Sequence, residues 1–317
     1  MDRFLTADDL AKTLRRDVRE GLESSPKTLP PKWFYDERGS ELFEEITRLE
    51  EYYPTRRERE ILIARAPEIA AVTGARTLLE LGAGSGEKTR LLLDALSGTL
   101  RTYVPVDVSG DFLVGAADQI AAEHPGLDVR PAVADYEQHL HLLPGGDRRL
   151  VAFLGGTIGN MPPADRIGFL SGLRATMEPD DALLIGADLV KDERRLVAAY
   201  DDAAGITAAF NRNVLHVINR ELDADFDTTA YEHVAFWNAA DEWIEMRLRS
   251  TRDQSVRVGG LDLEVSFTAG EEMRTEISSK FRRERLAAEL EAAGLVLAEF
   301  WTDEAADFSL SLARPAA

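Results

Sequence analysis

Three glycines at alternate positions, Gly82, Gly84 and Gly86, are the residues whose spacing points most directly to chemistry. They follow a short apolar run at 77–81 and precede a leucine-rich helical pattern. A strand, a glycine turn and a helix bring backbone N–H groups close to a nucleotide-like ligand. Glu87 stands where a dinucleotide-binding turn would carry its third glycine. A plain tight turn between a strand and a helix is the alternative at this point.

Acidic residues stand at the ends of the next two predicted strands. Asp107 lies 107 − 86 = 21 residues after the last glycine, and Asp135 and Tyr136 end the strand after that. At the carboxyl edge of a parallel sheet, Asp107 could accept hydrogen bonds from two ribose hydroxyls and Asp135 from an adenine amino group, while Tyr136 packs on the ring. Each acid could instead cap the following helix. With Glu80 two residues before the first glycine, the pattern resembles class I S-adenosylmethionine (SAM) methyltransferases more than a nicotinamide site.

SAM carries its reactive methyl group on a sulfonium cation. Methyl transfer is an in-line displacement by a neutral nucleophile, governed by positioning and desolvation. We therefore expect SAM as the cofactor, S-adenosylhomocysteine as its product, and no metal. The five histidines show no metal-ligand spacing, and we expect His139 and His141 on a solvated surface.

The residues above need a sheet to bring them together. Strand signals alternate with helix signals along the middle of the chain, which predicts right-handed crossovers and an α/β fold, a doubly wound parallel sheet covered on both faces. A final helix and hairpin would close a Rossmann-like class I methyltransferase sheet with an antiparallel last strand. The predicted strands are 77–81, 102–106, 127–133, 149–154, 181–187, 295–301 and 308–312.

A second α+β unit is predicted from the remaining residues. Polar and apolar residues alternate between 231 and 267, which is typical of antiparallel strands with one wet face, and helices are expected at 5–22, 193–201 and 206–222. We place residues 57–190 with 282–317 in a SAM-binding domain and residues 1–56 with 191–281 in a substrate-binding domain.

Two aromatic segments lie before the glycine turn, KWFYD at 32–36 and EYYP at 51–54. Aromatic residues this dense either pack as a small core or line a pocket, and both readings stay open. Thr55 and Glu58 fit a capping box at the start of the helix that follows.

Composition excludes several function classes. The chain has 317 residues, enough for two structural units, and a net charge of 37 − 57 = −20, which disfavours nucleic acid and anionic membranes as partners. It contains no cysteine, so disulfides, thiolate metal sites and cysteine nucleophiles are excluded. No apolar run approaches the ~18 residues of a membrane span, and the N-terminus lacks the apolar core of a signal peptide. We expect a cytoplasmic protein that acts as a monomer.

Seven segments of this sequence resemble one known family, the histidine Nα-methyltransferases of ergothioneine biosynthesis. The resemblance covers nearly the whole chain and both units. It implies transfer of three methyl groups from SAM to the α-amino group of L-histidine, giving hercynine. The segments are KWFYD, EYYPTR, LELGAGSGEKTRLLLDAL, FLGGTIGN, DLVKD, AYDDAAGITAAFNRNVL and EEMRTEISSKF.

The resemblance also implies a role for individual residues. It places SAM against the glycine turn together with Lys88 and the strand-end residues, and it makes Tyr35 and Tyr52 the candidate catalytic residues beside the amine. Implied cofactor-binding residues are Gly82, Gly84, Gly86, Lys88, Asp107, Asp135 and Tyr136. The resemblance implies that the substrate carboxylate is held by Asn160 and Tyr200. It implies that the imidazole is held by Tyr52, Glu276 and Ser278, with Met246 packing nearby. The pocket would be lined by Phe43, Gly155 and Thr157.

Glu276 and Ser278 make chemical sense as imidazole ligands. A carboxylate can accept one ring N–H and a hydroxyl can satisfy the other nitrogen, and two residues two apart on a strand point the same way. Glu276 could also be a solvated strand residue. The sequence departs from the family pattern at Ala134-Asp135-Tyr136, at Gly84-Ser85-Gly86 and at the second serine of EISSKF. None of these departures removes a proposed substrate contact.

Three other functions compete with this one. They are a SAM-dependent N-methyltransferase of another amino acid or biogenic amine, a non-catalytic SAM-binding protein and a nicotinamide dehydrogenase. A tryptophan-like acceptor would favour an apolar residue in place of Glu276, and Glu87 disfavours the dehydrogenase. If a deprotonated amine is the nucleophile, the rate should rise towards alkaline pH.

Overall fold

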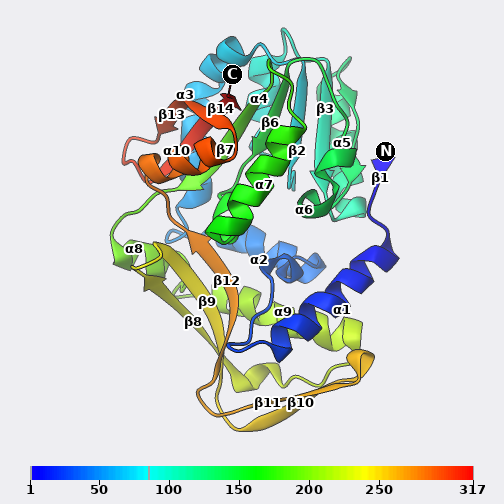
Figure 1. The fold of residues 1–317 in the computed structure, drawn as a ribbon, viewed down its shortest axis with the longest axis vertical. Coiled ribbons are helices and arrows are strands. Elements are labelled where there is room, and N and C mark those ends of the chain that lie inside the picture. Colours follow the sequence, from blue (N-terminus) through cyan, green and yellow to red (C-terminus); the bar gives the residue numbers. More distant parts are fainter. Residues whose placement is uncertain (1, 85, 317) are drawn as a thin grey trace. The chain divides into compact units, whose positions relative to one another are not determined.

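The computed structural model describes residues 2–84 and 86–316. It divides into two compact units (Figure 1). The first unit holds the described residues of Met1–Thr6, Pro54–Val190 and Phe281–Ala317, and the second holds Ala7–Tyr53 and Lys191–Lys280. We expected residues 2–6, 54–56 and 281 in the second unit, but they belong to the first. The roles given to the two units, cofactor binding and substrate binding, remain predictions.

The first unit is built on a mostly parallel sheet. Its strands run in the order β1-β5-β3-β2-β6-β7-β14-β13, with β4 beside β3. Strand β14 is antiparallel to β7, and β13 is antiparallel to β14. The predicted α/β fold with an antiparallel last strand is therefore confirmed. The strands are β1 (Asp2–Arg3), β2 (Thr77–Leu81), β3 (Thr102–Asp107), β4 (Asp128–Val129), β5 (Ala132–Val133), β6 (Arg149–Phe153), β7 (Ala182–Asp188), β13 (Leu295–Thr302) and β14 (Phe308–Pro315).

Helices cover both faces of this sheet because consecutive strand residues point to opposite sides. Leu78 packs in an apolar cluster with helices α3 and α4, whereas Leu79 packs in another with α7 and α10. Figure 1 shows α7 in front of the sheet. Strands β2, β6 and β7 are buried along their whole length, as expected for a sheet covered on both sides. The helices of this unit are α3 (Pro54–Thr73), α4 (Thr89–Leu96), α5 (Gly110–Glu123), α6 (Tyr136–His139), α7 (Pro163–Ala175) and α10 (Arg283–Ala292).

The predicted third strand, 127–133, is wrong in one respect, because it forms two short pieces, β4 and β5. Pro131 lies between them and has no backbone N–H to continue the ladder. Strand β1 pairs in parallel with β5, and Asp2 N donates to Pro131 O at 3.0 Å. A two-residue strand has too little sequence pattern to be predicted, and we did not predict β1.

The predicted capping box is also wrong. Helix α3 begins at Pro54, one residue before Thr55, and proline suits the first turn because its missing N–H would have no helical partner. The carboxylate of Glu58 is buried and accepts a hydrogen bond from Gly155 N at 2.8 Å. Glu58 therefore binds the backbone of the loop at Gly155, far away in the sequence, and does not cap its own helix.

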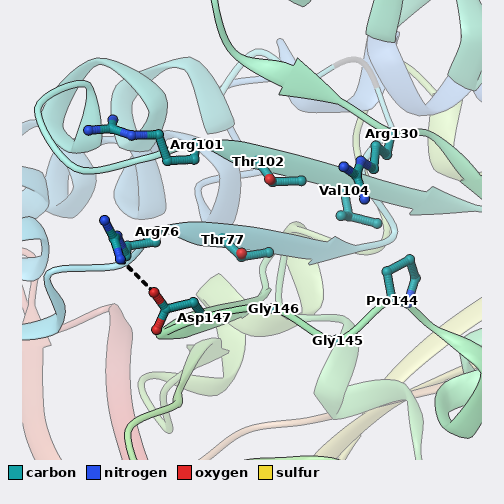
Figure 2. Close-up of a pocket in the computed structure, with 10 residues that line it drawn as sticks. All are labelled: Arg76, Thr77, Arg101, Thr102, Val104, Arg130, Pro144, Gly145, Gly146 and Asp147. Carbon is teal, nitrogen blue, oxygen red and sulfur yellow. Dashed lines mark hydrogen bonds and ion pairs between the residues drawn. The ribbon is translucent and has the colours of Figure 1, made fainter.

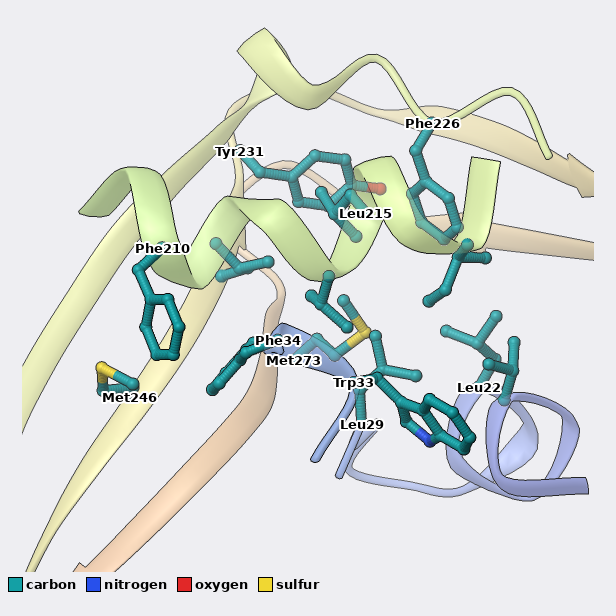
Figure 3. Close-up of a cluster of buried hydrophobic side chains, with 14 of the residues drawn as sticks. Leu22, Leu29, Trp33, Phe34, Phe210, Leu215, Phe226, Tyr231, Met246 and Met273 are labelled. Carbon is teal, nitrogen blue, oxygen red and sulfur yellow. The ribbon is translucent and has the colours of Figure 1, made fainter. Parts of the chain in front are cut away.

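The second unit packs helices against a three-stranded antiparallel sheet of order β12-β9-β8, with a separate hairpin β10-β11. Helix α9 carries Phe210 and Leu215 into the apolar cluster shown in Figure 3, where they meet Phe34 and Met246. Tyr52 and Tyr53 also lie in this core, so the aromatic segments do pack as a core. The elements are α1 (Ala7–Glu23), α2 (Glu37–Thr47), α8 (Glu193–Ala198), α9 (Ile206–Leu222), β8 (Tyr231–Asn238), β9 (Trp243–Ser250), β10 (Gln254–Val258), β11 (Leu263–Phe267) and β12 (Glu272–Ser279). Among the described residues, we find no helix with the length and apolar content needed to cross a bilayer.

Candidate functional site

The glycine turn begins where strand β2 ends. Gly82, Gly84 and Gly86 have φ angles of +69°, +51° and +65°, in the left-handed region that side chains disfavour. Gly82 N donates to Val106 O at 2.9 Å, which ties the turn to the end of β3. Ser85, named above as a departure from the family pattern, lies outside the described residues. The three glycines are thus required by the backbone geometry of the turn.

Asp107 joins the same turn from the end of β3. Its carboxylate accepts hydrogen bonds from Gly84 N at 3.2 Å and from Ser109 N at 2.9 Å. Burial raises the pKa of Asp107, and the backbone N–H groups of Ser109 and Gly84 act against that rise. The structure therefore brings Asp107 and the glycine turn together at one edge of the sheet. Each carboxylate oxygen has a further lone pair for a ligand hydroxyl.

Asp135 caps the short helix α6, the alternative role that the sequence left open. One oxygen accepts from Glu137 N at 2.9 Å and the other from the Gln138 side chain at 2.7 Å. His139 is part of this turn, since its Nδ1 accepts the N–H of Asp135 at 3.1 Å, and it is partly exposed, while His141 is exposed. An adenine contact by Asp135 would be additional to its cap.

Tyr136 is held by two aromatic rings. Its ring meets Phe153 at 5.3 Å and Phe169 at 5.9 Å between centroids, both nearly edge-on. Burial raises its pKa. A methyl group on Gly82 would come within 4.0 Å of the Tyr136 ring, so this ring lies directly beside the glycine turn. It is placed to pack on a flat ligand there.

Lys88 is tied to a buried carboxylate that the sequence analysis assigned to a helix cap. Glu58 accepts from Lys88 Nζ with one oxygen and from Gly155 N with the other. Gly186 makes room for this carboxylate, because a Cβ there would lie 2.0 Å from Glu58 Oε1. Glu58 thus links the loop after β2 to the loop after β6. The one local sign of this link in the sequence is that residue 186 is a glycine.

Glu80 lies under the turn and has a structural role. It is buried, and its two oxygens accept from Thr89 Oγ1 at 2.5 Å and Tyr103 Oη at 2.6 Å. Burial raises the pKa of Glu80 to about 7, against the lowering effect of these two hydroxyls. Glu80 therefore fastens β2 to β3 and to the first residue of α4.

The loop after β6 carries the remaining predicted residues of the first unit. Gly155 and Gly156 have φ angles of +81° and +73°, and the 3₁₀ segment η3 (Thr157–Asn160) follows. Thr157 Oγ1 donates to Leu154 O at 3.2 Å. Since β6 runs parallel to β2 as its neighbour, Asn160 follows a strand that ends at the same edge as the glycine turn.

A pocket of about 330 Å³ lies at the opposite end of these strands (Figure 2). Thr77 and Thr102, the first residues of β2 and β3, line it together with Arg76, Arg101 and Arg130. Arg76 is paired with Asp147 at 2.7 Å. Because ligands of open α/β sheets bind at the carboxyl ends of the strands, this pocket is separate from the predicted cofactor residues.

The predicted substrate residues of the second unit include three on adjacent strands. Glu276 and Ser278 lie two apart on β12, and Met246 on β9 is the register partner of Glu276. Directly opposite residues of an antiparallel pair share a face, so all three belong to one face of the sheet, as predicted for the first two. The register shifts between Arg274 and Glu276.

Tyr200 and Ser278 are joined by a residue that sequence reasoning missed, Lys280. Tyr200 Oη lies 2.7 Å from Ser278 Oγ, and Lys280 Nζ donates to both oxygens at 2.9 Å. Lys280 is fully buried, and its Nζ lies 4.5 Å from the centre of the Tyr200 ring. Lys280 directly follows the last residue of β12 and is two residues from Ser278, as Ser278 is from Glu276; this spacing was the available signal.

Aromatic rings connect the other predicted residues of this unit. Tyr35 contacts Phe43 at 5.5 Å, Phe43 contacts Tyr52 at 6.1 Å, and Tyr52 contacts Tyr200 at 6.3 Å, all nearly edge-on. Tyr35 is 40% exposed while Tyr52 is buried. The structure thus brings Tyr35, Phe43, Tyr52, Tyr200 and Ser278 into one chain of contacts.

A second buried network, also missed from the sequence, holds the backbone of Tyr200. His233 Nε2 lies 2.8 Å from Tyr200 O and therefore donates, while its Nδ1 accepts from Asn211 Nδ2 at 2.8 Å. Asn211 Oδ1 in turn accepts from Thr275 Oγ1 at 2.6 Å, beside Glu276. Burial lowers the pKa of His233, in keeping with the neutral ring that this network requires.

Comparison with known proteins agrees with the resemblance inferred from the sequence. Residues 14–315 match the family described as "Histidine-specific methyltransferase, SAM-dependent". The Histidine N-alpha-methyltransferase of Mycolicibacterium smegmatis (strain ATCC 700084 / mc(2)155) is 59% identical over 312 residues, 98% of this chain and 97% of that protein. The protein of the same name from Mycobacterium tuberculosis (strain CDC 1551 / Oshkosh) is 59% identical over 302 residues, 95% of this chain and 94% of that protein.

Among solved structures, a S-adenosylmethionine-dependent methyltransferase from Clostridium acetobutylicum ATCC 824 overlaps 82% of this chain and 92% of its own, with a TM-score of 0.45 and 12% identity. So loose an overlap bears on neither substrate nor site. The match over 14–315 and the 59% identity over nearly the full length do settle the family. The chain belongs to the SAM-dependent, histidine-specific methyltransferases.

Proposed function

We propose that this chain transfers three methyl groups in succession from SAM to the α-amino group of L-histidine, giving hercynine for ergothioneine biosynthesis. The observation that carries the proposal is the polar set at the end of β12, where Glu276 and Ser278 share a face and Ser278 is bonded to Tyr200 and Lys280. A buried carboxylate and hydroxyl suit an imidazole ring. The relatives with the same name at 59% identity support this choice of substrate.

The first unit fits SAM as the methyl donor. When bound, SAM supplies a methyl group on a sulfonium and leaves as S-adenosylhomocysteine. Three left-handed glycines open the backbone of the turn, and Asp107, tied to that turn through Gly84 N, would receive the ribose hydroxyls. Tyr136 would pack on the adenine and Asp135 accept from its amino group, while Lys88 would hold the methionine end beside Glu58.

The second unit would hold histidine by its two ends and leave its amine accessible. Tyr200 would bind the carboxylate, and Glu276, Ser278 and Tyr52 would bind the ring. Holding both ends of histidine would fix its amine in one position relative to the methyl group of SAM, which lowers the entropic cost of the transfer. The mono- and dimethyl products keep the same ring and carboxylate, so they can bind again.

Each methylation needs a neutral amine nitrogen. A N–C bond forms as the C–S bond of the donor breaks, and a proton must leave the nitrogen before each of the first two products can react again. Tyr35 and Tyr52 are the hydroxyls that we assign to orient the amine and pass its proton to water. Tyr35 is the more exposed of the two and is therefore the better route to solvent.

Mass spectrometry tests the proposal directly. The purified chain is incubated with SAM and, separately, with histidine and each other standard amino acid. We expect three successive gains of one methyl group on histidine alone. Absence of any product from histidine would refute the proposal, and methylation of a different amino acid or a biogenic amine would support the alternative acceptor.

A further inference from the structure

The pocket at the amino-terminal ends of β2 and β3 has the size of a small-molecule site (Figure 2). Its volume of about 330 Å³ falls at the lower end of the range of about 300–1,000 Å³ that such sites occupy. Four separate segments between residues 76 and 147 line it, all of them in the first unit. The pocket is therefore a property of this unit alone.

The charged side chains of this pocket are mostly cationic. Arg76, Arg101 and Arg130 line it, against one lining carboxylate, that of Asp147. In the view of Figure 2, Arg76 and Arg101 lie on one side of the two lining threonines, and Arg130 lies on the other. The whole chain carries a net charge of −20, so anions that the rest of the surface repels are attracted here.

The three guanidinium groups are held only weakly by protein carboxylates. Arg76 pairs with Asp147 at 2.7 Å and Arg130 with Asp128 at 2.5 Å, and all four side chains are about half exposed or more. Ion pairs this exposed contribute little to stability, so an incoming anion can replace the carboxylate at small cost. Within residues 2–84 and 86–316, Arg101 pairs with no carboxylate, and its Nη1 donates to the carbonyl of the preceding residue at 2.8 Å.

Thr77 supplies a buried hydroxyl to the same pocket. Its side chain lines the pocket and the residue is only 5% exposed, yet its Oγ1 makes no hydrogen bond with the described part of the chain. Gly146 keeps this hydroxyl uncovered, because a Cβ at 146 would lie 2.4 Å from Thr77 Oγ1. A buried hydroxyl without a partner is costly, and a ligand oxygen in the pocket would satisfy it.

We propose that this pocket binds the phosphate group of a small polar metabolite, a phosphate monoester or a diphosphate. The planar guanidinium group matches phosphate oxygens in pairs, and a phosphate presents three terminal oxygens to the surrounding donors, one more than a carboxylate. None of the ten lining residues is aromatic, so a nucleobase would have no ring on which to stack. The body of the ligand should therefore be compact and hydrophilic.

A ligand in this pocket leaves the proposed methyl-transfer site free. Thr77 at the start of β2 is five residues before Gly82, roughly 16 Å of strand at ~3.3 Å per residue. The phosphorylated ligand and SAM can therefore be bound at the same time, and the inference does not rest on the proposed function.

Isothermal titration calorimetry of the full chain at low ionic strength tests the site with inorganic phosphate, pyrophosphate and ribose 5-phosphate. We expect saturable binding of one equivalent of pyrophosphate or ribose 5-phosphate, and the tighter of the two identifies the ligand as a diphosphate or a monoester. Ribose, and citrate at equal ionic strength, should bind at least roughly tenfold more weakly because they lack the phosphate. No saturable binding of a phosphate probe, or tighter binding of citrate, would overturn the proposal. Tighter binding of inorganic phosphate than of both larger probes would overturn the assignment to a metabolite.

Substitutions of lining residues locate the binding. Arg101→Met should weaken it by about tenfold and Thr77→Val by about threefold, as expected for a charged and a neutral hydrogen bond. Asp147→Asn should tighten it by roughly threefold, because the competing carboxylate is gone. Arg65→Met and Glu68→Gln are the matched controls, since this pair on α3 is similarly exposed and lies outside the pocket, and neither should change the affinity.

The opposite effects of Arg101→Met and Asp147→Asn carry the test even if Thr77→Val does not fold, because both residues are exposed. Equal affinity in wild type and these two variants would overturn the proposal. A titration with saturating S-adenosylhomocysteine then separates the pocket from the glycine turn. Unchanged affinity for the phosphate probe supports the pocket, and competition would overturn it. Failure of S-adenosylhomocysteine itself to bind would count against the proposed function, while the variants still decide on the pocket.

Discussion

Glu58 accepts a hydrogen bond from the backbone N–H of Gly155 at 2.8 Å, although the two residues are 97 positions apart. The same carboxylate binds Lys88. Gly186 on β7 leaves the space that this carboxylate fills. One buried acid therefore holds together two loops that carry predicted ligand-binding residues, and its position depends on a glycine in a third element.

Gly186→Ala should destabilise the chain by about 3 kcal/mol, the usual scale for disrupting a buried ion pair. The new Cβ would lie 2.0 Å from Glu58 Oε1 and 3.2 Å from the Phe308 ring, so the carboxylate would have to move. Denaturant unfolding measures the loss. Gly168→Ala is the control, because a Cβ at this helical position meets nothing within 4 Å and alanine favours helix.

A double-mutant cycle identifies the cause of that loss. In a Glu58→Ala background the carboxylate is gone, and Gly186→Ala should cost clearly less than in wild type. Strictly additive losses would show that Gly186 acts through Phe308 or the backbone.

Glu80→Gln should change how stability depends on pH. Burial raises the pKa of Glu80 to about 7, from an ordinary 4.5, so between these values the folded chain keeps a proton that the unfolded chain has lost. The stabilising contribution is complete below 4.5 and is lost as pH rises through about 7. The difference between a pKa of 4.5 and one of about 7 corresponds to on the order of 3 kcal/mol.

Unfolding curves between pH 5 and 8 test this prediction. Wild type should lose stability as pH rises, and Glu80→Gln should lose less, because the amide of glutamine does not titrate in this range. Glu123→Gln is the comparison, because Arg90 lowers the pKa of this exposed carboxyl and its titration lies below the range measured. Parallel curves for wild type and Glu80→Gln would contradict the prediction.

Titration of His233 should make the chain less stable as pH falls, the opposite of the effect of Glu80. Burial lowers its pKa, so below the ordinary value of about 6.5 the unfolded chain binds a proton that the folded chain resists. The stability that the neutral His233 ring contributes is therefore complete above about pH 6.5, and it is lost as pH falls through the lowered pKa of the folded chain. Protonation would also end the acceptance from Asn211 that His233 Nδ1 provides.

Stability measured between pH 7 and 5 checks this expectation. His233→Asn should flatten the acid loss, and His141→Asn, at an exposed position, should not. If His233→Asn loses as much stability as wild type between pH 7 and 5, other groups cause the loss.

Local sequence was enough for the longer strands and for the glycine turn, because both are properties of short segments. Apolar runs of five to seven residues that alternate with helical patterns are typical of buried strands in a parallel sheet, and the positive φ angles of Gly82, Gly84 and Gly86 favour glycine. Pro131 could have been used in the same way, because a proline inside a predicted strand interrupts the ladder.

Partners far apart in sequence could not be predicted by this reasoning. Glu58 matched a local capping motif, yet Gly155 lies 97 residues away, and a buried partner outweighs a surface cap. Lys280 lies in one of the segments that resemble the family, but its hydrogen bond to Tyr200, 80 residues earlier, cannot be read from that segment. The residues assigned through family resemblance, such as Asn160 and Tyr35, likewise have no local signal for their roles.

Asp107→Asn should weaken binding of S-adenosylhomocysteine by about tenfold or more, since a hydrogen bond to a charged group contributes about 1.5–3 kcal/mol. The amide would retain one acceptor but lose charge and a second acceptor. Calorimetric titration measures the change. Asp128→Asn, at the exposed start of β4 beside Arg130, is the control, and equal affinities for the two variants would remove Asp107 from the cofactor site.

Glu276→Gln should raise the KM for histidine by roughly ten- to a hundredfold, the cost of losing a charged hydrogen-bond acceptor for the ring. Affinity for S-adenosylhomocysteine should stay within about twofold, because Glu276 is proposed to bind the substrate and not the cofactor. Steady-state kinetics and calorimetry measure the two effects separately. Glu272→Gln is the matched control on the same strand, where the carboxylate binds Arg247 and Arg249. Equal KM values in the two variants would show that Glu276 is a structural residue of β12 and that histidine is recognised elsewhere.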